Sequence, residues 1–157
     1  MARWADLEAE APDLAAAGRA LLYQFGAGLS YLATIRPDGG PRLHPVCVNL
    51  VDGVLYTLIV DSPKRGDLLR DGRYALHSFP PEGTDDEFYL TGQARHHPDS
   101  ELRARVVQAQ VESGATTSDD EELFELDIDH ALPARYKPRG EPDNFPPVYS
   151  RWRAPRD

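Results

Sequence analysis

The stretch that decides the fold reads VLYTLIV at residues 54–60 and continues directly as DSPKRGDLLR at residues 61–70. The first seven residues are mostly β-branched or aromatic, and such a run is typical of a strand that is buried on both faces. Ser62 is a favoured N-cap residue, and Pro63 is favoured at the first position of a helix. The stretch therefore predicts a buried strand that leads into a short helix.

The start of this helix has the features of an anion site. The first turn of a helix exposes unpaired N–H groups, and here the Ser62 hydroxyl and the Lys64 ammonium lie beside them, so a phosphate could be held there. Helix starts of this kind are also common in plain strand-to-helix connections. In that alternative, Lys64 and Arg65 are merely solvated.

Length and charge exclude several classes of protein. A chain of 157 residues suits one domain, spanning residues 1–157. Its formal net charge of −9 argues against nonspecific binding of nucleic acid, which needs a basic surplus. The longest apolar run, at residues 54–60, is too short to cross a bilayer, and the first residues lack the apolar core of a signal peptide. We therefore expect a cytoplasmic protein without a membrane partner.

The single cysteine, Cys47, excludes an internal disulfide and leaves no zinc-type cluster, so no metal site is expected. The acidic turn at residues 119–122 is interpreted as solvated.

Apolar periodicity and turn residues outline the remaining elements. Helices are predicted at residues 4–25, with a break at 11–13, and at residues 99–113. Strands are predicted at residues 29–35, 42–51, 54–60, 73–79, 87–96, 123–128 and 148–154. Most strands are joined by tight turns, such as the one at residues 37–40. The pattern predicts a mainly β fold with peripheral helices, built around an antiparallel barrel.

The second strand has an unusual composition. Its side chains alternate between two faces, with Arg42, His44 and Val46 on one and Leu43, Pro45 and Cys47 on the other. Pro45 cannot donate to a ladder, so the strand is either an edge strand or bulged at that point. Such a gap would let a planar ligand bond to the backbone. The alternative is an edge strand whose Arg42 and His44 are solvated.

Several segments in order resemble the pyridoxamine 5′-phosphate oxidase-like family of flavin-binding split-barrel proteins, which includes flavin and deazaflavin oxidoreductases. They are YLATIRPDGGPRLHPV at 31–46, DGVLY at 52–56, SPK at 62–64 and LLRDGRYAL at 68–76. The resemblance covers residues 28–96 and continues more loosely at 123–128 and 149–153. It implies a six-stranded split barrel and a homodimer with two cofactor sites between the subunits.

The resemblance also implies a set of site residues. Arg42 stands where the family has an arginine, and Ser62-Pro63-Lys64 matches a Ser-Arg-Lys phosphate cradle in which Pro63 replaces the arginine. Arg65 is expected to supply the missing guanidinium. The implied cofactor-binding residues are Arg42, His44, Pro45, Val46, Ser62, Lys64 and Arg65. Cys47 stands where the oxidases proper have a lysine, which argues with Pro63 against a true pyridoxamine phosphate oxidase.

The resemblance implies FMN as cofactor and oxidoreduction of a small organic substrate. The flavin supplies the hydride chemistry and the protein orients its ring, so no catalytic residue is assigned. His44 is a candidate substrate contact, with a structural role as the alternative. Trp152 and Arg153 are further candidates, although packing of Trp152 against the barrel is the favoured interpretation.

Three alternatives remain open. The same fold could bind the larger deazaflavin coenzyme F-420, whose phosphate would occupy the same cradle. The protein could instead bind or store a flavin or haem without catalysis, haem being the less favoured cofactor. Finally, Pro63 and Cys47 could mark a domain that has lost its ligand.

Overall fold

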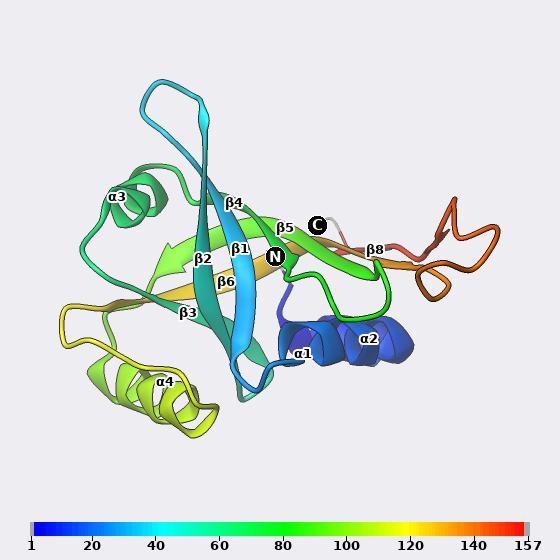
Figure 1. Cartoon of the computed structure of the whole chain (residues 1–157). Coiled ribbons are helices and arrows are strands. Elements are labelled where there is room, and N and C mark those ends of the chain that lie inside the picture. The colour runs from blue at the N-terminus through cyan, green and yellow to red at the C-terminus, as the bar shows by residue number, and fades with distance from the viewer. Residues whose placement is uncertain (1, 156–157) are drawn as a thin grey trace.

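The computed structural model describes residues 2–155, and a closed antiparallel barrel forms its centre (Figure 1). Its strands are β1 (Gly28–Ile35), β2 (Pro41–Val51), β3 (Val54–Ile59), β4 (Arg73–Ser78), β5 (Glu87–His96) and β6 (Glu122–Arg135). They are hydrogen-bonded in the order β3-β2-β1-β4-β5-β6, and pairing of β6 with β3 closes the barrel. The predicted antiparallel barrel is confirmed.

The helices lie around the outside of the barrel (Figure 1). They are α1 (Trp4–Glu10), α2 (Pro12–Leu22), α3 (Pro63–Arg70) and α4 (Ser100–Glu112). The predicted break is confirmed, because Ala11 separates α1 from α2 and Pro12 begins the second helix. The Asp99 side chain caps α4 by accepting hydrogen bonds from two backbone N–H groups, at 2.9 and 3.0 Å. None of the helices in residues 2–155 is long and apolar enough to cross a membrane.

β3 is buried at every position, as its sequence predicts. Leu55 and Ile59 belong to the main core inside the barrel. Tyr56 and Leu58 belong to a second apolar cluster, to which α4 contributes Val106. One strand thus supports both the barrel interior and the packing of α4, which explains its lack of polar alternation.

β6 is longer than the predicted 123–128. Glu125 and Asp127 lie on the opposite face from Phe124 and Leu126, yet their exposures are only 4% and 2%. The guanidinium of Arg95 donates to both carboxylates, at 3.3 and 3.1 Å. Burial has the largest effect on Asp127 and raises its pKa, whereas the positive charge of Arg95 acts to lower it. Alternation of polar and apolar residues indicates which side chains share a face of the strand. It does not indicate whether other parts of the protein cover the polar face.

The end of the chain is less regular than predicted. Instead of one strand at 148–154, two short strands pair with β6, namely β7 (Val148–Tyr149) and β8 (Trp152–Arg153). The ladder is interrupted at Ser150, whose N–H donates to the carbonyl of Pro133. The predicted strand is therefore divided into two short strands, one before and one after Ser150.

β2 is an edge strand over its first part. Its register with β1 is continuous from Pro41 to Val48, so there is no bulge at Pro45. Within β2, only residues 48–51 pair with β3. Within residues 2–155, positions 41–47 thus have a strand neighbour on one side alone. The hairpin of β1 and β2 projects beyond the barrel near α3 (Figure 1). Of the two expectations for Pro45, the edge strand is confirmed and the bulge is wrong.

Candidate functional site

A cavity of about 230 Å³ lies beside the open part of β2. Three residues implied as cofactor ligands line it, namely Pro45, Val46 and Lys64. Leu29, Leu58 and Val60 add apolar walls, and Cys47, Gln110, Thr116 and Glu121 complete the lining. The cavity thus combines apolar surface with a lysine at one side, a composition that suits an apolar ring carrying an anionic group.

The start of α3 supplies fewer phosphate donors than its sequence indicates. Ser62 occupies the N-cap position, but its hydroxyl donates to the carbonyl of Val60 at 2.9 Å and does not cap the helix. Val60 lies just past the end of β3, where its carbonyl needs a donor. Pro63 has no N–H, and the N–H of Arg65 donates to the carbonyl of Ser62. In the described residues, this leaves the backbone N–H and the ammonium of Lys64 for an anion.

Arg65 is held by acceptors of its own chain. Its guanidinium lies 2.6 Å from Asp61 and 3.7 Å from Glu122, and it donates to the carbonyl of Asp120 at 2.8 Å. The side chain is only 15% exposed and does not line the cavity. Arg65 therefore joins α3 to the loop before β6, and a phosphate would have to compete with these acceptors.

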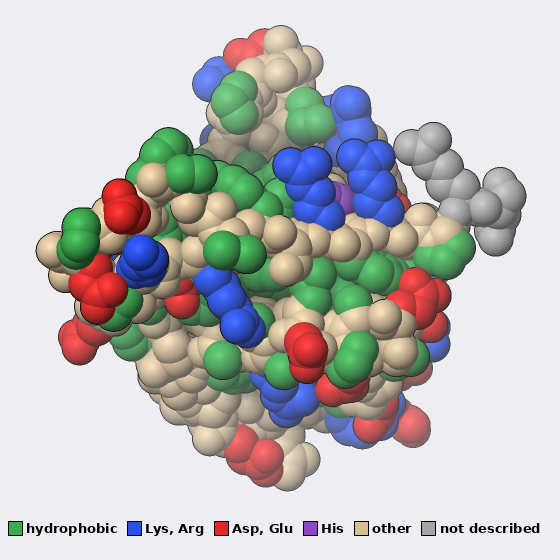
Figure 2. All heavy atoms as spheres, turned by 90° about the vertical axis from the view of Figure 1, so that its right-hand side faces the viewer, with side chains coloured by type: hydrophobic (Ala, Val, Ile, Leu, Met, Phe, Trp, Pro, Cys, Tyr) green, Lys and Arg blue, Asp and Glu red, His purple; other side chains and the backbone are tan. Residues whose placement is uncertain are grey.

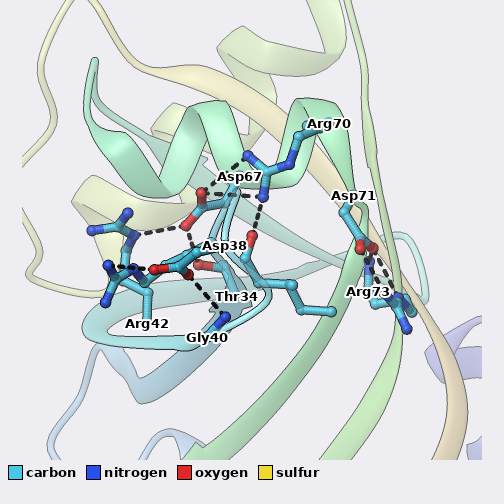
Figure 3. Close-up of polar contacts among 10 residues, drawn as sticks. Thr34, Asp38, Gly40, Arg42, Asp67, Arg70, Asp71 and Arg73 are labelled. Atoms are coloured by element: carbon cyan, nitrogen blue, oxygen red, sulfur yellow. Dashed lines mark hydrogen bonds and ion pairs between the residues drawn. The ribbon is translucent and has the colours of Figure 1, made fainter.

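Arg42 is joined to a buried carboxylate that the sequence did not single out (Figure 3). Its Nε donates to Oδ2 of Asp67 at 2.7 Å, and the Thr34 hydroxyl donates to the same oxygen at 2.9 Å. Arg70 reaches the other carboxylate oxygen at 3.3 Å and also donates to the carbonyl of Ile35. Asp67 thus links α3 to both β1 and β2.

The ionisation of Asp67 follows from these contacts. Burial opposes the charged form, because Asp67 is 2% exposed. The hydrogen bonds from Arg42 and Thr34, with the charge of Arg42, outweigh burial and lower the pKa of Asp67. The carboxylate is therefore charged at neutral pH and keeps the guanidinium of Arg42 in place.

Position along β2, and not the face of the strand, separates the implied ligands. Arg42 and His44 do not line the cavity, whereas Val46 on the same face lines it together with Pro45 on the opposite face. Of the seven implied cofactor residues, the structure gathers only Pro45, Val46 and Lys64 around the cavity. Arg42 instead braces α3, the helix on which Lys64 lies.

Trp152 and Arg153 lie on the other side of the barrel from α3 and α4, where β8 ends the fold (Figure 1). Trp152 is buried, and its indole N–H donates to Glu10 at 2.8 Å. Arg153 is exposed and pairs with His130 in the ladder. Burial and then the charges of Arg153 and Arg151 lower the pKa of His130. Within one chain, neither Trp152 nor Arg153 lines the cavity.

Figure 2 shows the face of the molecule on this side. Basic, acidic and hydrophobic side chains are interspersed over it, so no strongly basic surface is visible there.

Seven of the ten lining residues are absent from the site implied by the sequence, among them Gln110, Cys47 and Glu121. Gln110 is buried, accepts from the amide of Asn49 at 2.9 Å and donates to the carbonyl of Thr116 at 2.9 Å. Burial and then the charge of Glu121 raise the pKa of the Cys47 thiol. Glu121 belongs to the acidic turn that was interpreted as solvated, but it lines the cavity. Charge density along the chain does not reveal which carboxylate of such a turn points inward.

Sequence comparison leaves the chain without a family: no family model matches it, and no curated protein matches it. Solved structures do match. A heme binding protein from Mycobacterium smegmatis has a TM-score of 0.63 at 18% identity, covering 88% of this chain and 57% of that one. A candidate pyridoxamine 5′-phosphate oxidase from Listeria innocua has a TM-score of 0.57 at 18% identity, covering 72% and 91%.

A NimC/NimA family protein from Clostridium acetobutylicum likewise has a TM-score of 0.57 at 18% identity, covering 85% of this chain and 91% of that one. At this level of identity, the likeness concerns architecture. The resemblance found in the sequence is thus supported at the level of the fold: the chain is a six-stranded antiparallel split barrel with peripheral helices.

Proposed function

We propose that the protein binds FMN in the cavity beside β2 and acts as an oxidoreductase on a small organic substrate. The observation that carries this proposal is the position of Lys64, which lines an apolar cavity along the open edge of β2. A cofactor phosphate is close to dianionic, and charge-assisted hydrogen bonds to it are worth roughly 1.5–3 kcal/mol each. The ammonium and the backbone N–H of Lys64 are the donors available for it.

The remainder of the cavity suits a planar heterocycle. Leu29, Leu58 and Val60 offer apolar walls, and the backbone of residues 45–47, which pairs with a strand on one side alone, offers polar groups for a polar ring edge. Bound flavin would supply the hydride chemistry. The chain's own contribution would be to orient the ring and to fix the phosphate.

The size of the cavity supports a homodimer as part of the proposal. Its volume of about 230 Å³ is below the roughly 300–1,000 Å³ that is usual for small-molecule sites. A second copy of the chain, placed against the open edge of β2, would complete the walls. Trp152 and Arg153 could then contribute to the site only from the partner subunit, because they lie elsewhere on their own chain.

Haem is the second candidate ligand, because one structural neighbour is a heme binding protein and another is a heme storage protein. The expectation that haem is less favoured conflicts with these neighbours and has to be tested directly. The donor set of the cavity is the observation that favours flavin. No histidine lines it among the described residues, and Cys47 is the only side chain there of a type that ligates haem iron.

The test is a comparison of cofactors on the purified full-length chain. FMN, deazaflavin coenzyme F-420 and haem are titrated separately, and binding is followed by visible absorption. We expect FMN to bind and to be reduced by a nicotinamide nucleotide, with reoxidation by an acceptor. Binding of haem alone would replace the proposal by haem binding or storage, and tighter binding of F-420 would make it a deazaflavin reductase. Bound FMN without turnover would indicate storage.

A further inference from the structure

Glu121 enters the same cavity as Lys64, from the loop in front of β6. Its Oε2 accepts a hydrogen bond from the N–H of Ser118 at 3.2 Å. Within residues 2–155, its Oε1 makes no hydrogen bond. One carboxyl oxygen is therefore available to whatever enters the cavity.

The position of Glu121 is held by α4. Arg103 donates from its Nε to the carbonyl of Glu121 at 2.7 Å, and its Nη2 donates to the carbonyls of Ser118 and Asp119 at 3.3 and 3.2 Å. Gln110 holds the beginning of the same loop through the carbonyl of Thr116. Anchoring at both points keeps the carboxyl group at the cavity wall.

The charged and titratable groups around Glu121 come from every neighbouring element. Burial has the largest effect and raises the pKa of Glu121, and the charge of Asp120 acts in the same direction. The Ser118 N–H, the charge of Arg103 on α4 and the charge of Lys64 on α3 act to lower this pKa. On the β2 wall, the Cys47 thiol faces the same carboxyl group.

From this arrangement we propose that Glu121 is a specificity-determining residue, which weakens binding of a dianionic phosphate beside Lys64 unless Glu121 takes up a proton. A dianionic phosphate placed next to a carboxylate in a partly desolvated cavity is repelled. Uptake of a proton from solvent by Glu121 removes this repulsion and leaves the charge of Lys64 for the phosphate. The inference rests on the proposed function and adds the charge state of the ligand that the site accepts.

The test compares FMN binding by the full-length wild type and by Glu121→Gln between about pH 5 and pH 8. As the pH falls, protonation of Glu121 removes the difference in charge between the two proteins, and we expect their dissociation constants to converge toward the acidic end. At the alkaline end we expect Glu121→Gln to bind FMN about tenfold more tightly than wild type. This ratio corresponds to a rise of about one in the pKa of Glu121 when the phosphate binds. The last ionisation of free FMN phosphate, with a pKa of about 6, is common to both titrations and cancels in the ratio.

Two further measurements isolate the phosphate. Riboflavin has the same ring without a phosphate. The ratio of its dissociation constants for wild type and Glu121→Gln is therefore expected not to change with pH. Titration calorimetry near pH 7, in buffers of different ionisation enthalpy, is expected to show proton uptake on FMN binding by wild type that exceeds the uptake by Glu121→Gln.

Glu8→Gln is the matched control, because Glu8 is exposed on α1 and its loss changes the net charge equally. It is expected to behave as wild type. If FMN binds and the pH profiles of wild type and Glu121→Gln coincide, the inference is overturned while the proposed function stands. If FMN binds to neither protein at any pH, both fail. Glu121→Ala replaces Glu121→Gln, with the same expected ratio, if circular dichroism shows that the first variant does not fold.

Discussion

Lys64 and Asp67 lie three positions apart on α3, yet they have different surroundings. Lys64 lines the cavity, whereas Asp67 is buried under Arg42, Thr34 and Arg70. Residues three apart on a helix are neighbours on one face. The contacts of Asp67 therefore hold the helix that carries Lys64 against β1 and β2, although Asp67 itself does not line the cavity.

Replacement of Lys64 tests the proposed phosphate contact. Lys64→Ala removes the ammonium, and we expect the dissociation constant of FMN to rise tenfold or more. A tenfold rise is a loss of roughly 1.4 kcal/mol in the free energy of binding. The matched control is Lys137→Ala, because Lys137 is exposed in the loop after β6 and does not line the cavity. Fluorescence titration of both variants provides the comparison. An unchanged constant for Lys64→Ala removes Lys64 from the site.

Replacement of Asp67 tests its bracing role. Asp67→Asn leaves Arg42 without its carboxylate, and we expect the free energy of unfolding at pH 7 to fall by about 2–3 kcal/mol. Asp38→Asn is the control, because Asp38 also pairs with an arginine in Figure 3 but is 61% exposed. Its expected effect is below about 1 kcal/mol. Urea unfolding measures both, and equal effects of the two variants would contradict the bracing role.

The same variant has an expected pH dependence. The pKa of Asp67 in the folded protein lies below its ordinary value of 3.8, so ionised Asp67 stabilises the fold above that value. The stabilisation is lost as the pH falls through the lowered pKa. The difference in unfolding free energy between wild type and Asp67→Asn is therefore expected to be constant near neutrality and to shrink in acid. A difference that grows on acidification would contradict this assignment.

At the scale of elements, close approach of two backbones explains one glycine of the barrel. An added Cβ at Gly92 would lie 1.8 Å from the carbonyl oxygen of Asp127, next to the register shift between β5 and β6. No side chain fits there without separation of the two strands. Gly66, in contrast, lies within α3 and has open space around the position of a Cβ.

These two glycines form a matched pair of substitutions. Gly92→Ala is expected to lower the unfolding free energy by roughly 3 kcal/mol or more, since the ladder has to shift. Gly66→Ala is expected to raise it by about 0.5–1 kcal/mol, because alanine is the better helix former. Thermal unfolding of both variants measures the signs. Destabilisation by Gly66→Ala would show that α3 is not the regular helix described above.

At the scale of the whole molecule, the open edge of β2 is the surface on which the proposed homodimer depends. Leu43 lies on this edge and is 63% exposed, and Pro45 is exposed beside it. An unpaired strand edge with an exposed leucine is a favourable surface for association. Because residues 45–47 at the end of this edge also line the cavity, assembly and cofactor binding should be coupled.

Leu43→Asp tests this coupling. The substitution is tolerated by an exposed position in the isolated chain, but we expect it to abolish the dimer in sedimentation velocity runs and to weaken FMN binding at least tenfold. Val111→Asp, at an exposed apolar position on α4, is the control and is expected to leave both properties unchanged. A wild type that sediments as a monomer with FMN bound would refute the proposed interfacial site.

Much of the fold could be predicted from local pattern. The strand at residues 54–60, the break at residues 11–13 and the helix predicted at 99–113 each depend on neighbours within a few positions, and each was confirmed. The site was predicted less completely. Pro45, Val46 and Lys64, which were expected at the cofactor, line one cavity in the described structure, whereas Arg65 was expected at the phosphate but is bound to its own chain.

The sequence by itself determined the antiparallel barrel, the edge character of β2 and the lysine at the start of α3, because periodicity, proline and helix-cap chemistry act locally. Only the tertiary structure decided that Asp67 binds Arg42, that Glu121 faces the cavity and that Trp152 bonds to Glu10. These contacts join residues far apart in the chain. Their formation depends on which faces the closed barrel brings together and excludes from water, and no local pattern encodes that.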